Sequence, residues 1–199
     1  MQTAKKRMQT KTLVLGAVLT AMVILLQMMG AFIHLGPFSI SLVLIPIVIG
    51  AATCGVGVST WLGFVFGIVV LASGDAAAFL AVHIVGTIVT VLLKGTLCGL
   101  ISGLAYKATL AIAGKNKSIG CYVAVLVAAI VCPLVNTGVF LLGCLAFFME
   151  TITGWAQAAG IANVGTYMIV VLVGANFLFE VGTNIILSPL VVRLLNIKK

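Results

Sequence analysis

His83-Ile-Val-Gly-Thr-Ile-Val-Thr-Val-Leu-Leu-Lys-Gly95 is the stretch that decides the fold, and its apolar run continues to Lys107. Read as a helix, it places His83, Thr87, Thr90 and Lys94 on one face, at spacings of 4, 3 and 4 residues. Lys94 lies 13 residues before Lys107, or about 20 Å along a helix, within a hydrocarbon core of about 30 Å. A charge at that depth costs roughly 3 kcal/mol or more. The stretch therefore predicts a transmembrane helix whose Lys94 faces the protein interior and has a partner there.

The composition indicates a membrane protein with several helical spans. Hydrophobic residues make up 63% of the 199 residues and charged residues 7%, with a mean hydropathy of +1.35. These values exclude a soluble globular domain, and the length suits a single transmembrane domain over residues 1–199. The net charge of +8 does not indicate nucleic-acid binding, because the basic residues lie at the ends of apolar segments. The first apolar run follows basic residues, as in a signal peptide, but its length favours a retained helix.

We predict an all-α integral membrane protein, a bundle of six transmembrane helices. The apolar runs and the Gly and Pro residues between them give the ranges 12–33, 39–54, 58–72, 77–107, 119–148 and 166–195. Pro46, Pro133 and Pro189 are expected to kink or interrupt three of these helices. Residues 150–165 are expected to form the longest polar connection.

The distribution of Lys and Arg predicts the orientation in the membrane. With six spans, ten of the eleven basic residues fall on one side, and the other side carries Asp75 and Glu150 without any Lys or Arg. The ten are Lys5, Lys6, Arg7, Lys11, Lys107, Lys115, Lys117, Arg193, Lys198 and Lys199. Because positive residues favour the cytoplasmic side, both termini are expected to be cytoplasmic. Five or seven spans would separate the two basic termini.

A second charged residue is expected at the depth of Lys94. Glu180 lies 13 residues before Arg193, and the same distance separates Lys94 from Lys107. If Lys107 and Arg193 mark the same interface, the two opposite charges lie level with each other. Ionisable groups inside a membrane usually mark function, although a Lys–Glu pair also serves as a clamp between helices.

Polar residues from three helices form the predicted substrate pocket, which is open to the outside and closed toward the cytoplasm. Its members are Lys94, Asn136, Asn176, Glu180, His83, Thr87 and Thr90. Structural roles remain open for several of them. The amides also act as hydrogen-bond links between helices, and the threonines also bond to their own backbone. His83, near an outer helix end, is also explained as an interfacial residue.

The first helix carries a surface of small residues. Ala17-x-x-x-Ala21, with Gly16 and Thr20 beside it, lets another helix approach closely. That helix belongs either to this chain or to a separate membrane partner.

Motifs for catalysis are missing from the sequence. It contains no HExxH, no GxSxG, no Walker loop and no CxxC among its five cysteines. We therefore expect no catalytic residues, no metal site and no cofactor bound by this chain, and an intramembrane enzyme is the least favoured reading. The competing class is a self-sufficient ion-coupled carrier or channel with Lys94 and Glu180 as its gate.

Several motifs together resemble the S components, the substrate-binding membrane subunits of energy-coupling factor (ECF) vitamin transporters. They are Ala17-x-x-x-Ala21, Gly36-Pro37-Phe38-Ser39-Ile40-Ser41 leading into Pro46, and the Gly-rich run 61–67. The resemblance covers nearly the whole chain. It implies a binder of a vitamin at the outer face of a prokaryotic plasma membrane. It also implies a partner module of one transmembrane coupling protein (T component), which contacts Ala17 and Ala21, and two ATPases that use ATP and Mg. Toppling of the whole subunit in the membrane is the implied transport step.

Residues 86–95, 132–138 and 176–180 look most like the pantothenate-type members of that family. The carboxylate of pantothenate suits Lys94 or His83, and its hydroxyls and amide suit Asn136 and Asn176. A direct pair between Lys94 and Glu180 would weigh against this assignment. Riboflavin would need more aromatic stacking, whereas hydroxymethylpyrimidine or thiamin would use Glu180, so these vitamins stay open.

Overall fold

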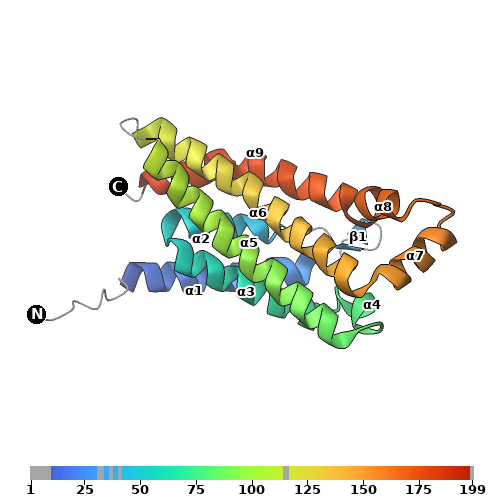
Figure 1. Ribbon diagram of the computed structural model, residues 1–199. Coiled ribbons are helices and arrows are strands. Elements are labelled where there is room, and N and C mark those ends of the chain that lie inside the picture. The colour runs from blue at the N-terminus through green and yellow to red at the C-terminus, as the bar shows by residue number, and fades with distance from the viewer. Residues whose placement is uncertain (1–9, 31–33, 36–37, 40–41, 114–116, 198–199) are drawn as a thin grey trace, which may run out of the picture.

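Long helices make up most of the computed structural model, which describes residues 10–30, 34–35, 38–39, 42–113 and 117–197 (Figure 1). Five helical segments are long and apolar enough to cross a membrane. They are α1 (Thr10–Gly30), α3 (Val56–Ser73), α5 (Ile84–Ile112), α6 (Lys117–Phe147), and the continuous run of α8 (Val164–Thr166), the π-helix η1 (Tyr167–Gly174) and α9 (Ala175–Ile197). The chain is thus a multi-pass membrane protein. Its described residues form five helices of spanning length and one shorter apolar helix, where the sequence predicts six spans.

The short elements gather mainly at one end of the bundle. Figure 1 shows α4 (Ala77–Leu80), α7 (Met149–Ala158), α8 and β1 (His34–Leu35) at one end, and the start of α1 with the end of α9 at the other. β1 pairs antiparallel with β2 (Phe38–Ser39). Parts of the predicted pattern lie outside the described residues, namely Gly36-Pro37, Ile40-Ser41 and the basic residues at 5–7, 115 and 198–199.

The second predicted helix, 39–54, is shorter in the structure. It is α2 (Leu44–Thr53), ten residues long, and covers about 15 Å at the rise of an α-helix. Pro46 lies in its first turn, where the missing N–H removes no helical hydrogen bond. Leu44, Ile47 and Val48 are at most 2% exposed. α2 therefore packs inside the bundle.

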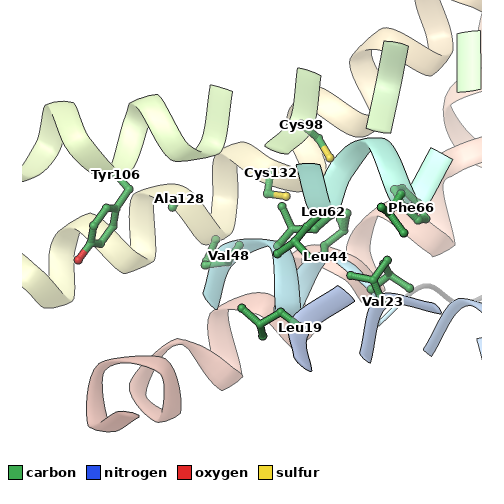
Figure 2. Close-up of a cluster of buried hydrophobic side chains, with 14 of the residues drawn as sticks. Leu19, Val23, Leu44, Val48, Leu62, Phe66, Cys98, Tyr106, Ala128 and Cys132 are labelled. Atoms are coloured by element: carbon green, nitrogen blue, oxygen red, sulfur yellow. The ribbon is translucent and has the colours of Figure 1, made fainter. Parts of the chain in front are cut away.

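The core lies where α1, α2, α3, α5 and α6 meet (Figure 2). Each helix contributes side chains that are at most 2% exposed, among them Leu19, Leu44, Leu62, Cys98 and Cys132. On the outside, large apolar side chains are exposed on every long helix, up to 85% at Ile112. A helix that is apolar on all sides is typical of a membrane span, so these outer faces contact lipid.

Glycines bring α3 and α5 into direct backbone contact. A Cβ on Gly63 would lie 2.1 Å from the carbonyl oxygen of Gly95, and one on Gly99 would lie 2.1 Å from that of Ser59. The Ser59 hydroxyl also donates to the carbonyl of Gly99 at 2.8 Å. Such close approach is the usual role of small residues between membrane helices. It holds Phe66 on α3 and Lys94 on α5 in a fixed relation.

The predicted helix 77–107 begins where α4 begins, but it is broken before Ile84 and continues beyond its predicted end. The chain forms α4, leaves the helical conformation at His83 (φ −150°, ψ 92°), and begins α5 at Ile84. His83 caps the new helix, because its Nδ1 accepts a hydrogen bond from the Gly86 N–H at 2.8 Å. α5 then continues to Ile112, so Lys107 lies within a helix.

The predicted connection 150–165 is also wrong, because most of it is helical. α7 begins at Met149, and Phe148, Ile152 and Ala156, four residues apart, are at most 2% exposed. They pack with Phe79 and Tyr167 in a second apolar cluster. This one-sided pattern makes a helix favourable.

The interruptions predicted at Pro133 and Pro189 are not found. α6 runs through Pro133 and α9 runs through Pro189. Membrane helices tolerate proline where neighbouring groups satisfy the carbonyl that it leaves free.

Candidate functional site

A cavity of about 70 Å³ lies between α1, α3, α5, α6 and α9. Six of the seven residues predicted for the pocket line it: Thr87, Thr90, Lys94, Asn136, Asn176 and Glu180. Residues that the sequence analysis did not assign to the pocket also line it, including Gln27, Phe66, Asp75, Phe79, Phe140 and Phe148. An adjoining void of about 40 Å³ shares Lys94, Asn136, Phe140 and Asn176. The structure thus brings together polar groups that are up to 153 residues apart in the chain.

The α5 stripe reaches the cavity as its helical spacing predicts. Thr87, Thr90 and Lys94 lie within two turns on one face, and the two threonines are 2% and 4% exposed. Thr87 Oγ1 donates to the His83 carbonyl at 2.9 Å, which is the backbone bond considered as its structural role. Lys94 is therefore the group on this stripe that carries charge into the cavity.

The Lys94 ammonium lies between two aromatic rings. Its Nζ is 5.7 Å from the ring centre of Phe66 and 5.3 Å from that of Phe140. Contacts of this length are cation–π interactions, which offset part of the cost of removing the charge from water. They leave the ammonium hydrogens available to an acceptor in the cavity.

Glu180 is a buried acidic residue on α9 that lines the same cavity as Lys94. Its side chain is 1% exposed, and Oε1 accepts a hydrogen bond from Asn176 Nδ2 at 3.2 Å. Asn176 and Glu180 are four residues apart on α9, so one helical turn brings them together. The π-helical segment η1 ends directly before this turn. π-Helical turns are frequent at functional sites and change the register of the helix that follows.

Lys94 and Glu180 share the cavity without touching. Their opposite charges attract each other electrostatically. Within the described part of the chain, however, no hydrogen bond or ion pair joins the two side chains, and Glu180 Oε2 has no hydrogen-bond partner. The direct clamp considered from the sequence is therefore not formed.

Four buried oxygen atoms at the cavity lack a hydrogen-bond partner among the described residues. They are Thr90 Oγ1, Asn136 Oδ1, Asn176 Oδ1 and Glu180 Oε2. A buried polar atom without a partner costs about 1–3 kcal/mol. Such a concentration of unsatisfied atoms at one place is unusual for a packed core and typical of a site that binds a polar molecule.

His83 is the predicted pocket residue that the cavity does not include. It is exposed at the start of α5 and packs against Phe147, with 5.7 Å between ring centres. Its Nδ1 serves the helix cap described above. A role for His83 in ligand binding stays a prediction.

A hydrogen bond from α1 reaches the cavity at a point that the sequence analysis missed. Gln27, 2% exposed, donates to the carboxylate of Asp75 in the turn after α3, and both residues line the cavity. Asp75 is one of three acidic residues in the chain. An acidic residue in so apolar a chain is a signal of a functional position, but only the fold shows that Gln27 of α1 contacts it.

Aromatic rings close the cavity toward α4 and α7. Phe79 makes edge contacts with Phe140, Phe148 and Trp155, at centroid distances of 5.6, 5.0 and 5.5 Å. These rings give the cavity an apolar side next to its charged residues, a combination common in small-molecule sites.

Ala17 and Ala21 lie on the outer surface of α1, and both are exposed. The groove beside them is lined by Gly16, Thr20 and Trp61, and the Trp61 indole donates to Thr20 Oγ1 at 3.2 Å. The buried face of the helix is a different one, made by Leu19, Val23, Gln27 and Gly30. Gly16 and Thr20 thus lie beside Val58 and Trp61 of α3, whereas Ala17 and Ala21 are not buried by another helix in the described part of the chain.

Metal-ligating residues do not cluster in the described ranges. Over these ranges no group of three or more His, Cys, Asp or Glu side chains is placed to hold a metal ion. The side chain of His34, which was considered together with His83, lies outside the described side chains.

Comparison with known proteins identifies a family for this chain. A family model described as "ECF transporter, substrate-specific component" matches residues 11–194. Neither the curated proteins nor the solved structures gave a match.

Proposed function

The chain belongs to the family of substrate-specific components of ECF transporters, and on this premise we propose that it captures a water-soluble vitamin, with pantothenate as first candidate. Capture takes place at the extracellular face of a prokaryotic plasma membrane, and both termini are cytoplasmic. The subunit then docks on a T component and two ATPases, topples in the membrane and releases the vitamin inside.

The cavity is the observation that carries this proposal. It holds two opposite charges that do not pair and four oxygens without partners. A structural clamp would join Lys94 to Glu180 directly, whereas a binding site keeps both available. Intramembrane charges with this arrangement favour a role in substrate recognition.

Pantothenate suits the distribution of polar groups. Its carboxylate would bind the Lys94 ammonium, and its hydroxyl and amide groups would bind Asn136, Asn176 and Glu180. The absence of a direct bond between Lys94 and Glu180 supports this assignment, because such a bond would have occupied the cation. Riboflavin stays an alternative because the aromatic side of the cavity could stack on it. Hydroxymethylpyrimidine and thiamin stay alternatives because Glu180 could bind them.

Energy for transport is expected to come from partner subunits. The sequence has no Walker loop, so ATP and Mg would be bound by the ATPases. The exposed Ala17 and Ala21 offer a smooth helix surface for the T component.

Ligand identity in the purified protein tests the proposal. Mass spectrometry would identify the small molecules that co-purify, and pantothenate, riboflavin, thiamin and hydroxymethylpyrimidine would then be titrated separately. Tight pantothenate binding is the expected result. Tight binding of another vitamin would keep the subunit's role and change its substrate. If no vitamin binds, and the protein alone conducts ions or solutes in liposomes, the chain is a self-sufficient carrier or channel instead.

A further inference from the structure

One wall of the cavity presents three hydrogen-bond acceptors that have no partner among the described residues. Asn136 Oδ1, Asn176 Oδ1 and Glu180 Oε2 line the cavity, and each lacks a partner among the described residues. Asn136 is 6% exposed and Glu180 is 1% exposed. We call these three residues the acceptor wall.

The orientation of the Asn176 amide follows from its neighbour. A carboxylate accepts hydrogen bonds and has none to donate, so the amide nitrogen of Asn176 must face Glu180 Oε1, as it does at 3.2 Å. Its oxygen is consequently the atom left for a ligand. The acceptor wall can therefore be satisfied only by a molecule that brings donors, such as hydroxyl, amide N–H or amino groups.

Lys94 supplies the opposite chemistry from α5. Its ammonium has three donor hydrogens and no acceptor, and its described contacts are the faces of Phe66 and Phe140. It can be satisfied best by an anion or a carbonyl oxygen. The cavity thus has one site for an acceptor group, on α5, and one for donor groups, on α6 and α9.

We propose that the cavity selects bipolar ligands, which present a carboxylate to Lys94 and separate hydroxyl, amide or amino donors to the acceptor wall. This inference rests on the proposed function, since it specifies the ligand of that same site. It assigns Glu180 as a specificity-determining residue for donors and Lys94 as one for the anion. A ligand with only one of the two groups would leave part of the cavity unsatisfied.

A matched pair of probes separates the two groups. Pantothenate carries a carboxylate and hydroxyl donors, and panthenol is the same molecule with a hydroxymethyl group in place of the carboxylate. Hydrogen bonds to charged groups correspond to a change in affinity of about 10- to 100-fold. We expect wild-type protein in nanodiscs to bind pantothenate more tightly than panthenol by a factor in this range, as measured by titration calorimetry.

Variants assign each effect to one residue. Lys94→Met should bring the two dissociation constants to nearly the same value, because the carboxylate no longer has its partner. Glu180→Gln should weaken both probes by a similar factor of about tenfold and keep their ratio, because the probes differ only at the end that replaces the carboxylate and share the other hydroxyls and the amide. Thr183→Val is the matched control. Thr183 lies on α9 next to Glu180 in helical spacing and does not line the cavity. Its hydroxyl donates to the backbone carbonyls of Phe179 at 2.8 Å and Glu180 at 3.1 Å, so it does not touch the Glu180 carboxylate.

A single substitution leaves one charge without its counterpart, so folding must be checked. Size-exclusion profiles and unfolding temperatures serve this purpose. The double variant Lys94→Met/Glu180→Gln has no charge from either residue, and it should bind both probes weakly and with equal affinity. It keeps the test decisive if Lys94→Met does not fold.

Two outcomes overturn the inference while the proposed function stands. One is a preference for pantothenate over panthenol that survives Lys94→Met, or unchanged binding of both probes by Glu180→Gln. The other is a different vitamin as ligand, bound by both variants as tightly as by wild type. A different vitamin supports the inference only if it carries a carboxylate and loses affinity in both variants. Tight binding of a vitamin without a carboxylate overturns it. Failure of every vitamin to bind wild-type protein would overturn the proposed function and this inference with it.

Discussion

Replacing Gly99 by alanine should loosen the contact between α3 and α5. The new Cβ would lie 2.1 Å from the Ser59 carbonyl oxygen, about 0.9 Å closer than the 3.0 Å limit that Cβ atoms keep. The Ser59 oxygen is a backbone atom, and the Cβ of alanine is fixed to the backbone of α5. No side-chain rotation therefore relieves the overlap, and the helices must separate. Separation also lengthens the hydrogen bond from Ser59 Oγ to the Gly99 carbonyl, now 2.8 Å.

The expected cost combines two effects. Overpacking costs about 1–3 kcal/mol, and loss of the Ser59 hydrogen bond costs about 1 kcal/mol. Alanine in place of glycine regains up to about 1 kcal/mol through helix propensity. The net loss in the free energy of unfolding is therefore about 1–3 kcal/mol.

Gly138→Ala on α6 is the control. A Cβ at Gly138 would meet no atom within 4 Å, so this variant has the gain in propensity without the overlap. Reversible unfolding in mixed micelles, followed by Trp fluorescence, gives both free energies. Gly99→Ala should be less stable than Gly138→Ala by about 2–4 kcal/mol. Equal stability of the two variants would refute the assigned close contact.

Two further predictions concern transport and orientation. The double variant Ala17→Trp/Ala21→Trp should abolish uptake by the assembled transporter and leave vitamin affinity unchanged, because both side chains lie on the outer surface of α1. The control is Ile186→Trp on the lipid-facing side of α9. If the double variant takes up vitamin as well as this control, docking at this face of α1 is contradicted. In intact cells and a cysteine-free background, a membrane-impermeant maleimide should label Gln157→Cys and leave Lys107→Cys unlabelled, because the basic end of the bundle is expected in the cytoplasm. The reverse pattern would invert the topology.

Most of the site was predictable because helical spacing is a local property. Thr87, Thr90 and Lys94 share a face in any α-helix, and six of the seven predicted residues line one cavity. The position of His83 outside the cavity has a physical cause. A histidine that begins an apolar run looks like part of the polar stripe, but here its Nδ1 caps the helix.

Local signals were weaker at the element boundaries. α4 and α5 are separated by three residues, of which His83 is extended, within an apolar stretch, and composition does not reveal this break. α7 lies in a segment rich in polar residues, and its burial of Ile152 and Ala156 depends on a cluster formed with α4, α6 and η1. α2 begins at Leu44, five residues later than predicted, and packs inside the bundle.

By itself, the sequence determined that this chain lies in a membrane, that charged groups lie within its spans, and which faces of the helices carry them. Hydropathy and helical period are properties of consecutive residues, so they need no knowledge of the fold. Only the tertiary structure decided that Lys94 and Glu180 face one cavity without pairing, that Phe66 and Phe140 flank the ammonium, and that Gln27 reaches Asp75. These relations depend on distances between helices that are set by packing, such as the close glycine contacts between α3 and α5.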